Sequence, residues 1–327
     1  MSVLWTRSLR TRSLAVALLA GALLPVPAPA ADWPSRPVRI VAPATPGGAA
    51  DTFARILTDN LPDIVGGRFF VENRAGAGRL IGAQVTAAAE PDGATFMTSS
   101  VAYQAIAPAV SANPGFHPLR DFTHIAYIGG PPNVFVVNPG FGVRSLADLI
   151  ARAKVQPVGY VSPGVGTLGH LTAERFAQLA GVQLQHIPHK GASTATMDLL
   201  AGTVNLGTMT WTSALGQIRA GKLTPIAVTS NARLAEFPDI PTFKELGYPD
   251  LIATTWFGVS GPAGVPADIV RKLNAAVIKV LALGEVRKRL DRDAIETRAM
   301  TPEEFTAFMA SEIDKWAPLA RQVGQAN

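Results

Sequence analysis

Residues 38–61 read VRIVAPATPGGAADTFARILTDNL, and this stretch indicates the class of fold. Val38–Val41 is a short apolar run of the kind that forms a buried strand. A tight turn at Pro46-Gly47-Gly48 follows, and apolar residues then recur at helical spacing, at Phe53, Ile56, Leu57 and Leu61. A strand, a glycine turn and an amphipathic helix together make the first part of a β-α-β unit.

The same alternation continues along the chain. We expect further strands at residues 69–71, 95–97, 133–137, 158–161, 184–187 and 224–228. We expect helices at 49–61, 80–89, 145–153, 168–180, 194–201 and 267–283, and a last one that starts at Thr301-Pro302. This pattern predicts two α/β series with mostly parallel sheets, and 327 residues suffice for about two domains. Short crossovers between the series are expected near residues 128–132 and 252–258, where Gly or Pro follows a completed series.

The first thirty residues have the composition of a secretory signal. Arg7, Arg10 and Arg12 precede the apolar run Leu14–Leu24, and small residues at Ala28 and Ala30 fit a signal-peptidase site. We therefore expect a signal peptide at residues 1–30, cleaved after Ala30, and a mature protein in the periplasm. The alternative is an uncleaved membrane anchor, but the apolar run is short for a bilayer.

Charge and cysteine content exclude several functions. Three of the 29 Lys and Arg residues lie in the predicted signal, which leaves 26 against 24 Asp and Glu and a net charge of only +2. That charge is too small to indicate a nucleic-acid partner. The chain has no Cys, so disulfides, thiolate metal sites and cysteine nucleophiles are all excluded.

Three glycine-rich turns lie where an expected strand passes into an expected helix. They are Pro46-Gly47-Gly48, Arg74-Ala75-Gly76-Ala77-Gly78 and Gly164-Val165-Gly166-Thr167. Helix N-termini carry unpaired N–H groups and partial positive charge, and in open α/β sheets ligands bind at this edge. Together the turns predict an anion-binding site that needs no Lys or Arg. The alternative is that they are ordinary tight turns.

Enzymatic interpretations are weaker. Residues 164–169 match the G-x-G-x-x-G pattern, but no acidic residue follows the next strand to hold a ribose, so no nucleotide cofactor is expected. The five His show no zinc-site spacing, and His117 and His124 are expected in a surface loop. A secreted hydrolase that uses Ser99 and His170 is the enzyme alternative, although no G-x-S-x-G elbow occurs. His170, in the first turn of its helix, is expected to face the ligand.

The chain resembles the Bug family, the solute receptors of tripartite tricarboxylate transporters. The resemblance extends over nearly the whole mature chain, with its motifs in order. It rests on Trp33–Val41, Pro46–Asp51, Val71–Gly78, Pro91-Asp92-Gly93, Gly166–Leu171, His186–Gly191, Ala220–Leu223 and Pro241-Thr242-Phe243.

This resemblance implies a type II periplasmic-binding-protein fold, with two α/β lobes and a ligand cleft between them. The lobes are expected at residues 31–130 with 253–327, and at residues 131–252. It also implies a monomeric receptor that closes on a small carboxylate, needs no cofactor or metal, catalyses nothing and docks on membrane transport subunits. A periplasmic sensor that serves a signalling partner would share the same fold and is a further alternative.

The resemblance also implies which residues bind the ligand. The carboxylate role falls on Pro46, Gly47, Gly48, Ala77, Gly78, Ser99, Gly166, Thr167 and His170. Asp198 would contact a distal group of the ligand, or else be a helix-surface carboxylate. The sequence departs from the family pattern at Thr45, His189, Met209 and Trp211, which are expected to border the distal half of the ligand. Met209 and Trp211 indicate an aromatic or apolar tail.

Overall fold

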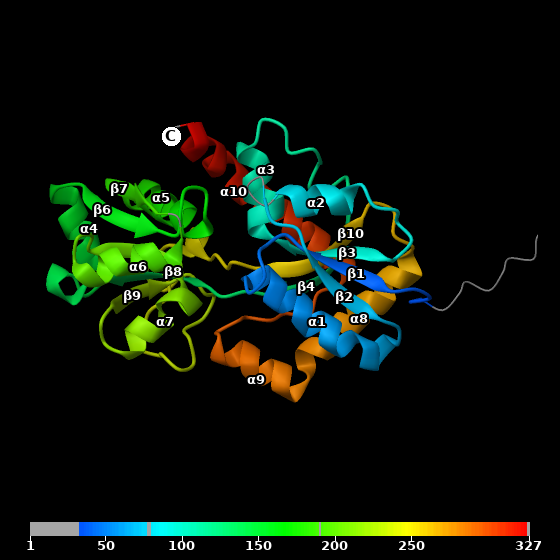
Figure 1. Ribbon diagram of the computed structural model, residues 1–327. Helices are drawn as coiled ribbons and strands as arrows, with labels where there is room; N and C mark the ends of the chain where they lie inside the picture. Colours follow the sequence, from blue (N-terminus) through cyan, green and yellow to red (C-terminus); the bar gives the residue numbers. More distant parts are fainter. Residues whose placement is uncertain (1–32, 77–79, 190, 326–327) are drawn as a thin grey trace, which may run out of the picture.

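The computed structural model describes residues 33–76, 80–189 and 191–325, and it divides them between two α/β lobes (Figure 1). Each lobe is built on one five-stranded sheet, which confirms the predicted fold class. The first sheet and its helices lie on the right of Figure 1, and the second lies on the left. The predicted signal peptide falls outside the described residues.

The first sheet has the strand order β2-β1-β3-β10-β4. Strands β1, β2 and β3 are parallel, and β10 is antiparallel to both of its neighbours. The strands are β1 (Val38–Ala42), β2 (Phe69–Asn73), β3 (Thr95–Ser100), β4 (Phe122–Gly129) and β10 (Phe257–Pro262). The helices of this lobe are α1 (Ala49–Val65), α2 (Leu80–Ala87), the π-helical turn η2 (Ala102–Ile106), α3 (Ala107–Val110), α8 (Ala267–Ala282), α9 (Gly284–Arg292) and α10 (Pro302–Gln325).

The second sheet repeats this plan, with the order β7-β6-β8-β5-β9 and one antiparallel strand, β5, in the fourth position. Its strands are β5 (Asn133–Val137), β6 (Val158–Ser162), β7 (Leu184–Pro188), β8 (Leu206–Thr210) and β9 (Thr224–Val228). Its helices are α4 (Leu146–Val155), α5 (Leu168–Ala180), α6 (Ala192–Ala201) and α7 (Trp211–Arg219).

The connections between the sheets decide which edges face each other. The chain passes from the end of β4 to the start of β5 within residues 130–132, and it returns through residues 229–256 into β10. The two connections meet at a β-bridge between Pro132 and Thr254. The start of β10 pairs with Ser100 at the end of β3, and the start of β5 pairs with Thr210 at the end of β8. The carboxyl ends of the parallel strands in both sheets therefore lie toward the connections. In open α/β sheets, ligands generally bind at this edge.

Apolar packing holds each lobe together and also joins the two. One buried cluster fills the first lobe beneath α1 and α8, and two others cover the faces of the second sheet. A further cluster contains Ile106 from η2, Leu168 and Leu171 from α5, and Trp316 and Leu319 from α10. The C-terminal helix therefore packs against the start of α5 in the second lobe, next to the predicted binding turn.

Two strands of the first sheet differ from the sequence-based expectation. β4 and β10 were not predicted, and His124 is not in a surface loop: it lies in β4 with 3% of its surface exposed. Its ring nitrogens contact Ser260 Oγ at 3.0 Å and the carbonyl of Pro118 at 3.1 Å. His117 is exposed, as expected. The lobe limits stay a prediction, because strand membership alone does not define a lobe.

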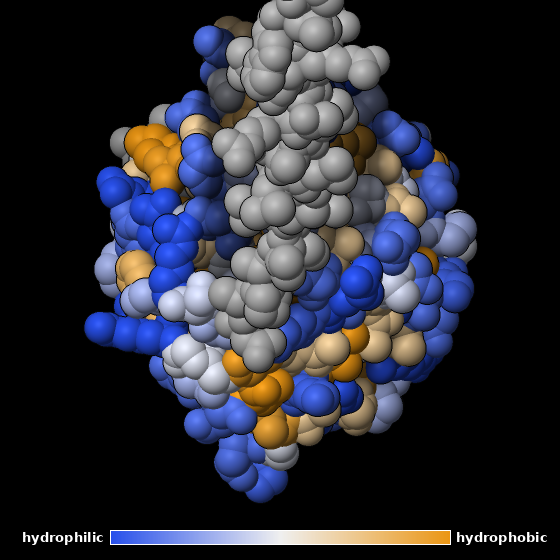
Figure 2. Space-filling view, turned by 90° about the vertical axis from the view of Figure 1, so that its right-hand side faces the viewer, coloured by the Kyte–Doolittle hydropathy of each residue, from blue (hydrophilic) through white to orange (hydrophobic). Residues whose placement is uncertain are grey.

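The outer end of the first lobe is mainly hydrophilic. Figure 2 shows this end, where the visible apolar residues form small groups among hydrophilic ones. Scattered groups of this kind are normal on a protein surface. Within the described residues, no helix is long and apolar enough to cross a membrane.

Candidate ligand-binding site

The first predicted turn links β1 to α1. Thr45, Pro46 and Gly47 are exposed, and Gly48 is the N-cap of the helix. Gly47 has a φ of 81°, a conformation that glycine adopts without strain. Its backbone N–H donates to Asp51 Oδ2 at 2.9 Å. This bond joins the exposed turn to the first turn of the helix that follows it.

Asp51 is the buried centre of this first-lobe turn. Its carboxylate also accepts from Arg55 Nε at 2.9 Å and from Asn73 Nδ2 at 3.0 Å, and the same Asn73 amide donates to the carbonyl of Ala44 at 3.1 Å. The bond from Arg55 is the main cause that lowers the pKa of Asp51 to about 2, with further lowering by the N–H of Gly47 and the amide of Asn73. Asp51 is therefore ionised and fixes the loops after both β1 and β2. The predicted contacts Ala77 and Gly78 lie outside the described residues.

Ser99 lies near the end of β3, as predicted, beside Gly258 of β10. The side chains of Ser99 and the adjacent Ser100 are buried, and their hydroxyl oxygens have no hydrogen-bond partner in the described part of the chain. Asn133 Oδ1 at the start of β5 and Ser230 Oγ just after β9 share this property. A buried polar atom without a hydrogen bond lowers the stability of the fold. Several such atoms at the facing sheet edges therefore indicate a site where a polar ligand or water binds.

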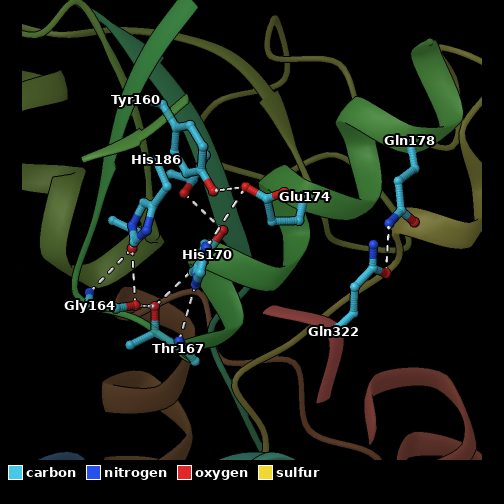
Figure 3. A network of polar contacts seen from close by, with 12 residues as sticks. Tyr160, Gly164, Thr167, His170, Glu174, Gln178, His186 and Gln322 are labelled. Atoms are coloured by element: carbon cyan, nitrogen blue, oxygen red, sulfur yellow. Dashed lines mark hydrogen bonds and ion pairs between the residues drawn. The ribbon is translucent and has the colours of Figure 1, made fainter. Parts of the chain in front are cut away.

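The third predicted turn links β6 to α5, and Figure 3 shows its contacts. Thr167 is the N-cap, and its Oγ1 accepts from the N–H of His170 at 3.3 Å and donates to the carbonyl of Gly164 at 2.8 Å. Gly166 has a φ of 70°, and its N–H donates to His170 Nδ1 at 3.1 Å. A Cβ placed on Gly166 would lie 3.9 Å from Ile106 of η2, so this turn approaches the first lobe.

His170 is 2% exposed and stacks on His186, with ring centroids 3.8 Å apart and an interplanar angle of 17°. Burial lowers the pKa of His170 to about 3, and the neighbouring His186 adds to this. Burial likewise lowers the pKa of His186 to about 4, with a contribution from His189. Both rings are therefore neutral near pH 7. Glu174 lies on the other side, where its carboxylate is 3.8 Å from His170 Nε2 and accepts from Tyr160 OH at 2.6 Å (Figure 3).

The remaining predicted residues, His189, Asp198, Met209 and Trp211, lie in the second lobe. His189 Nε2 is 3.3 Å from Asp198 Oδ2, which brings these two predicted residues together, although this nitrogen has no hydrogen-bond partner in the described structure. Met209 and Trp211 are 0% and 1% exposed and pack in the core, where Trp211 meets the ring of Phe237 at 4.9 Å. The structure thus brings Gly166, Thr167 and His170 together in one turn and places Met209 and Trp211 in the core of the second lobe.

Several residues of this region were not predicted from the sequence as part of the site: Asp51, Asn73, Ser100, Asn133, Ser162 and His186. Asp51 carried a usable signal, since it stands at the third position of an expected helix after a glycine turn. Ser162 and His186 did not, because they meet only through the pairing of β6 with β7, at 2.8 Å between Ser162 Oγ and His186 Nε2.

One cavity lies away from the glycine turns. It measures about 1030 Å³ and runs between residues 231–237 of the second lobe and residues 287–298 of the first. Its arginines are mostly paired with carboxylates, as in Arg233 with Glu245 and Arg287 with Asp291. We therefore do not assign it as the ligand site.

The comparisons with known proteins agree with this geometry. The tripartite tricarboxylate transporter family receptor (TctC) matches residues 53–325. The protein BugT of Bordetella pertussis is 35% identical over 319 residues, which cover 96% of this chain and 98% of BugT.

Several solved structures of binding proteins are also similar to this chain over most of its length. Rpa4515 of R. palustris, solved with adipate, is 32% identical with a TM-score of 0.76 and covers 90% of this chain and 99% of its own. MatC of Rhodopseudomonas palustris, with bound malate, is 27% identical with a TM-score of 0.73 over 88% and 99% of the two chains. The periplasmic binding protein BugD is 30% identical with a TM-score of 0.72 over 89% and 99%.

The fold and the site define a two-lobed solute receptor. The chain belongs to the TctC, or Bug, family of periplasmic receptors of tripartite tricarboxylate transporters. As a member of this receptor family it is a binding protein and not an enzyme.

The hydrolase alternative is therefore set aside. In the described structure the two residues proposed for it are not paired with each other. Ser99 Oγ has no hydrogen-bond partner there, and His170 Nδ1 is occupied by the N–H of Gly166.

Proposed function

We propose that this chain is exported by its N-terminal signal to the periplasm, captures a small organic carboxylate between its lobes, and delivers it to the membrane subunits of a tripartite transporter. The observation that carries the proposal is the pair of glycine turns, Thr45–Gly48 and Gly164–Thr167, each at the start of a helix on the facing edges of the two sheets. Family membership and the adipate and malate of two relatives support the ligand class.

The carboxylate is held by the backbone. The first N–H groups of a helix have no acceptor within the helix, and they carry partial positive charge. In α5 these are the N–H groups of Leu168 and Gly169, and in α1 those of Ala49 and Ala50. An acid group between the two helix starts would accept from both lobes, so its binding favours the state in which the lobes are close.

Polar contacts at the strand ends would hold the rest of the ligand. Ser99, Ser100 and Asn133 each keep a buried oxygen without a partner in the described structure, and each lies at a facing edge. A bound acid, or water that accompanies it, would satisfy these groups. An aromatic or apolar tail on the ligand was predicted from Met209 and Trp211. Both side chains are buried in the core, so the structure gives this prediction no support.

A thermal-shift screen of the mature protein tests this function. The panel is about a hundred aliphatic and aromatic carboxylic acids, with amines and sugars as controls. A ligand at 100 times its Kd stabilises by about 2.7 kcal/mol, which raises the Tm by roughly 5–10 °C. We expect one acid, or a small group of related acids, to give this shift and to be recovered unchanged. A shift with an amine or sugar alone, or consumption of the compound, would contradict the proposal.

A further inference from the structure

Behind the second-lobe turn lies a set of buried side chains that contact the backbone of the turn (Figure 3). Ser162 is 0% exposed, and its Oγ lies 3.2 Å from the nitrogen of Gly164 and 3.1 Å from its carbonyl oxygen. The same Oγ is 2.8 Å from His186 Nε2. His170 adds the bond from the N–H of Gly166. Gly164 and Gly166 of the turn are thus each hydrogen-bonded to a side chain of the second lobe.

The hydrogen bonds of Ser162 can be assigned by counting donors. The carbonyl of Gly164 has two lone pairs, and it already accepts from Thr167 N at 3.2 Å and Thr167 Oγ1 at 2.8 Å. The single proton of the Ser162 hydroxyl is then best used on His186 Nε2, which is the shorter of its two acceptor contacts. The oxygen of Ser162 remains free to accept from the N–H of Gly164.

The two imidazoles complete this arrangement. His170 accepts at Nδ1, so its proton is on Nε2, on the side of Glu174. His186 accepts at Nε2, so its proton is on Nδ1. The rings stack at 3.8 Å, and each therefore restricts the rotation of the other. Both nitrogens that act on the turn are acceptors, and only the neutral form of each ring provides them.

We infer that Ser162, His186 and His170 are positioning residues, which fix Gly164 and Gly166 so that the first N–H groups of α5 are held in place for the ligand. This inference rests on the proposed function and deepens it. It gives His170 a role different from the ligand contact expected from the sequence, because its ring is 2% exposed and its Nδ1 is already engaged by the turn. The ligand then meets backbone that is ordered before binding, which lowers the entropic cost of association.

Amide hydrogen exchange by NMR tests the positioning role without any ligand. Ser162→Ala removes the hydroxyl, and His186→Phe keeps a flat ring against His170 but removes Nε2. His186→Gln is the conservative variant, since its side-chain oxygen can reach the place of Nε2. We expect exchange at Gly164 and Gly166 to be at least about tenfold faster in Ser162→Ala and His186→Phe, and closer to wild type in His186→Gln. The amide of Gly202, which bonds to Leu199 O at the end of α6, is the internal control.

Two NMR results would overturn the inference outright, and a third would count against it. One is unchanged exchange at Gly164 and Gly166 in both Ser162→Ala and His186→Phe. The other is a wild-type imidazole ¹⁵N spectrum with His170 protonated on Nδ1, because that tautomer cannot accept from Gly166. Equal acceleration at Gly202 would show general loosening of the lobe and would also count against the inference.

Calorimetry with adipate and malate, the acids bound to two solved relatives, tests the link to binding. We expect Ser162→Ala and His186→Phe to bind the better of the two acids at least tenfold more weakly, and His186→Gln to recover most of the loss. Unchanged affinity alongside faster exchange would show that the turn is fastened for a reason other than binding. If the wild type binds no acid in the wider panel, the proposed function fails, and the exchange result still decides whether the turn is positioned in this way.

Discussion

Asp51, Asp148 and His170 occupy the same position in three helices, the third residue after the N-cap. In each case the side chain accepts from the backbone N–H of the residue before the N-cap: Gly47, Arg144 and Gly166, at 2.9, 3.0 and 3.1 Å. An ordinary capping box instead bonds the third residue to the N-cap itself. The bond reaches one residue further back, so it fixes the turn as well as the helix start. Two of these three turns are the predicted ligand turns.

Replacement of Asp51 by Asn tests this at the first-lobe turn. The amide keeps one acceptor but loses the charge that Arg55 and two N–H donors share, so we expect the free energy of unfolding in urea to fall by about 1–2 kcal/mol at pH 7. The folded pKa of Asp51, about 2, lies below its ordinary value of 3.8. Its contribution is therefore present above pH 3.8 and lost as pH falls toward 2. Asp59→Asn, exposed on the same helix, is the control, with an expected change below about 0.5 kcal/mol.

Replacement of Gly166 by Val tests the second-lobe turn directly. The φ of 70° is strained for a β-branched residue, so we expect the turn to change shape and carboxylate binding to be lost. Gly181→Val is a matched control, because Gly181 has a φ of 62° and ends the same helix, with open space where its Cβ would lie. The thermal shift by the best acid should disappear in Gly166→Val and persist in Gly181→Val. Equal shifts in the two variants would remove the turn from the site.

At the scale of elements, α10 links the two lobes. Its Gln322 receives a bond of 3.3 Å from Gln178 of α5 (Figure 3), and its Lys315 Nζ donates to the carbonyl of Ile252 at 2.5 Å. Glu312, on the same helix, accepts from Trp256 Nε1 at 2.8 Å, just before β10. The helix thus contacts both the return connection and the helix that carries the second-lobe turn.

The start of α10, expected at Thr301-Pro302, has a capping box between Thr301 and Glu304. Thr301 Oγ1 accepts from the N–H of Glu304 at 3.1 Å, and Glu304 Oε2 accepts from the N–H of Thr301 at 2.8 Å. We expect Thr301→Ala to lower the free energy of unfolding by about 1 kcal/mol, measured in urea. Thr306→Ala is the control, since this exposed hydroxyl bonds only back to Pro302 O within the helix. A loss of the same size in both variants would show that the cap itself contributes nothing.

At the scale of the whole molecule, local signals predicted most elements, but the strands β4, β8 and β10 and the helices α3, α7 and α9 were not expected. Asn133–Val137, Leu168–Ala180 and Thr224–Val228 form a strand, a helix and a strand with the bounds expected from apolar spacing and glycine turns. β10 reads FGVSGP, with two Gly and a Pro, and it is a strand because β3 and β4 pair with it on both sides. Periodicity cannot detect a strand that is stabilised by its neighbours.

The candidate site, too, combines features that local sequence predicts with contacts between distant residues that it does not predict. The turns at Thr45–Gly48 and Gly164–Thr167 were visible in the sequence, because glycine and cap residues act locally. The contacts that fasten them join distant positions, as between Asp51 and Asn73 or between Ser162 and His186. Met209 and Trp211 show the opposite case. Their types indicated a ligand contact, but an apolar side chain is also what a core requires, and sequence alone does not separate the two uses.

Two buried histidines, His124 and His170, and the half-buried His186 set the expected response of the whole molecule to acid. Burial lowers the pKa of His124 and His186 to about 4 and that of His170 to about 3, all below the ordinary 6.5. The unfolded chain therefore binds more protons than the folded one below pH 6.5, so the free energy of unfolding falls as pH decreases from 6.5 toward 4. Burial raises the pKa of Glu296 and Glu312, which acts in the opposite direction and reduces the net slope.

Urea unfolding of wild type and His124→Gln between pH 4 and 8 tests this response. His124 lies in β4, away from the ligand turns, and a shift of its pKa from 6.5 to about 4 corresponds to a difference on the order of 3 kcal/mol between the extremes. Gln cannot titrate, so its variant should lose stability less steeply below pH 6.5, whatever its stability at pH 8. Parallel curves for the two proteins would show that His124 has the same pKa in the folded and the unfolded chain, and the assignment of a ring kept neutral by burial between Ser260 and Pro118 would be wrong.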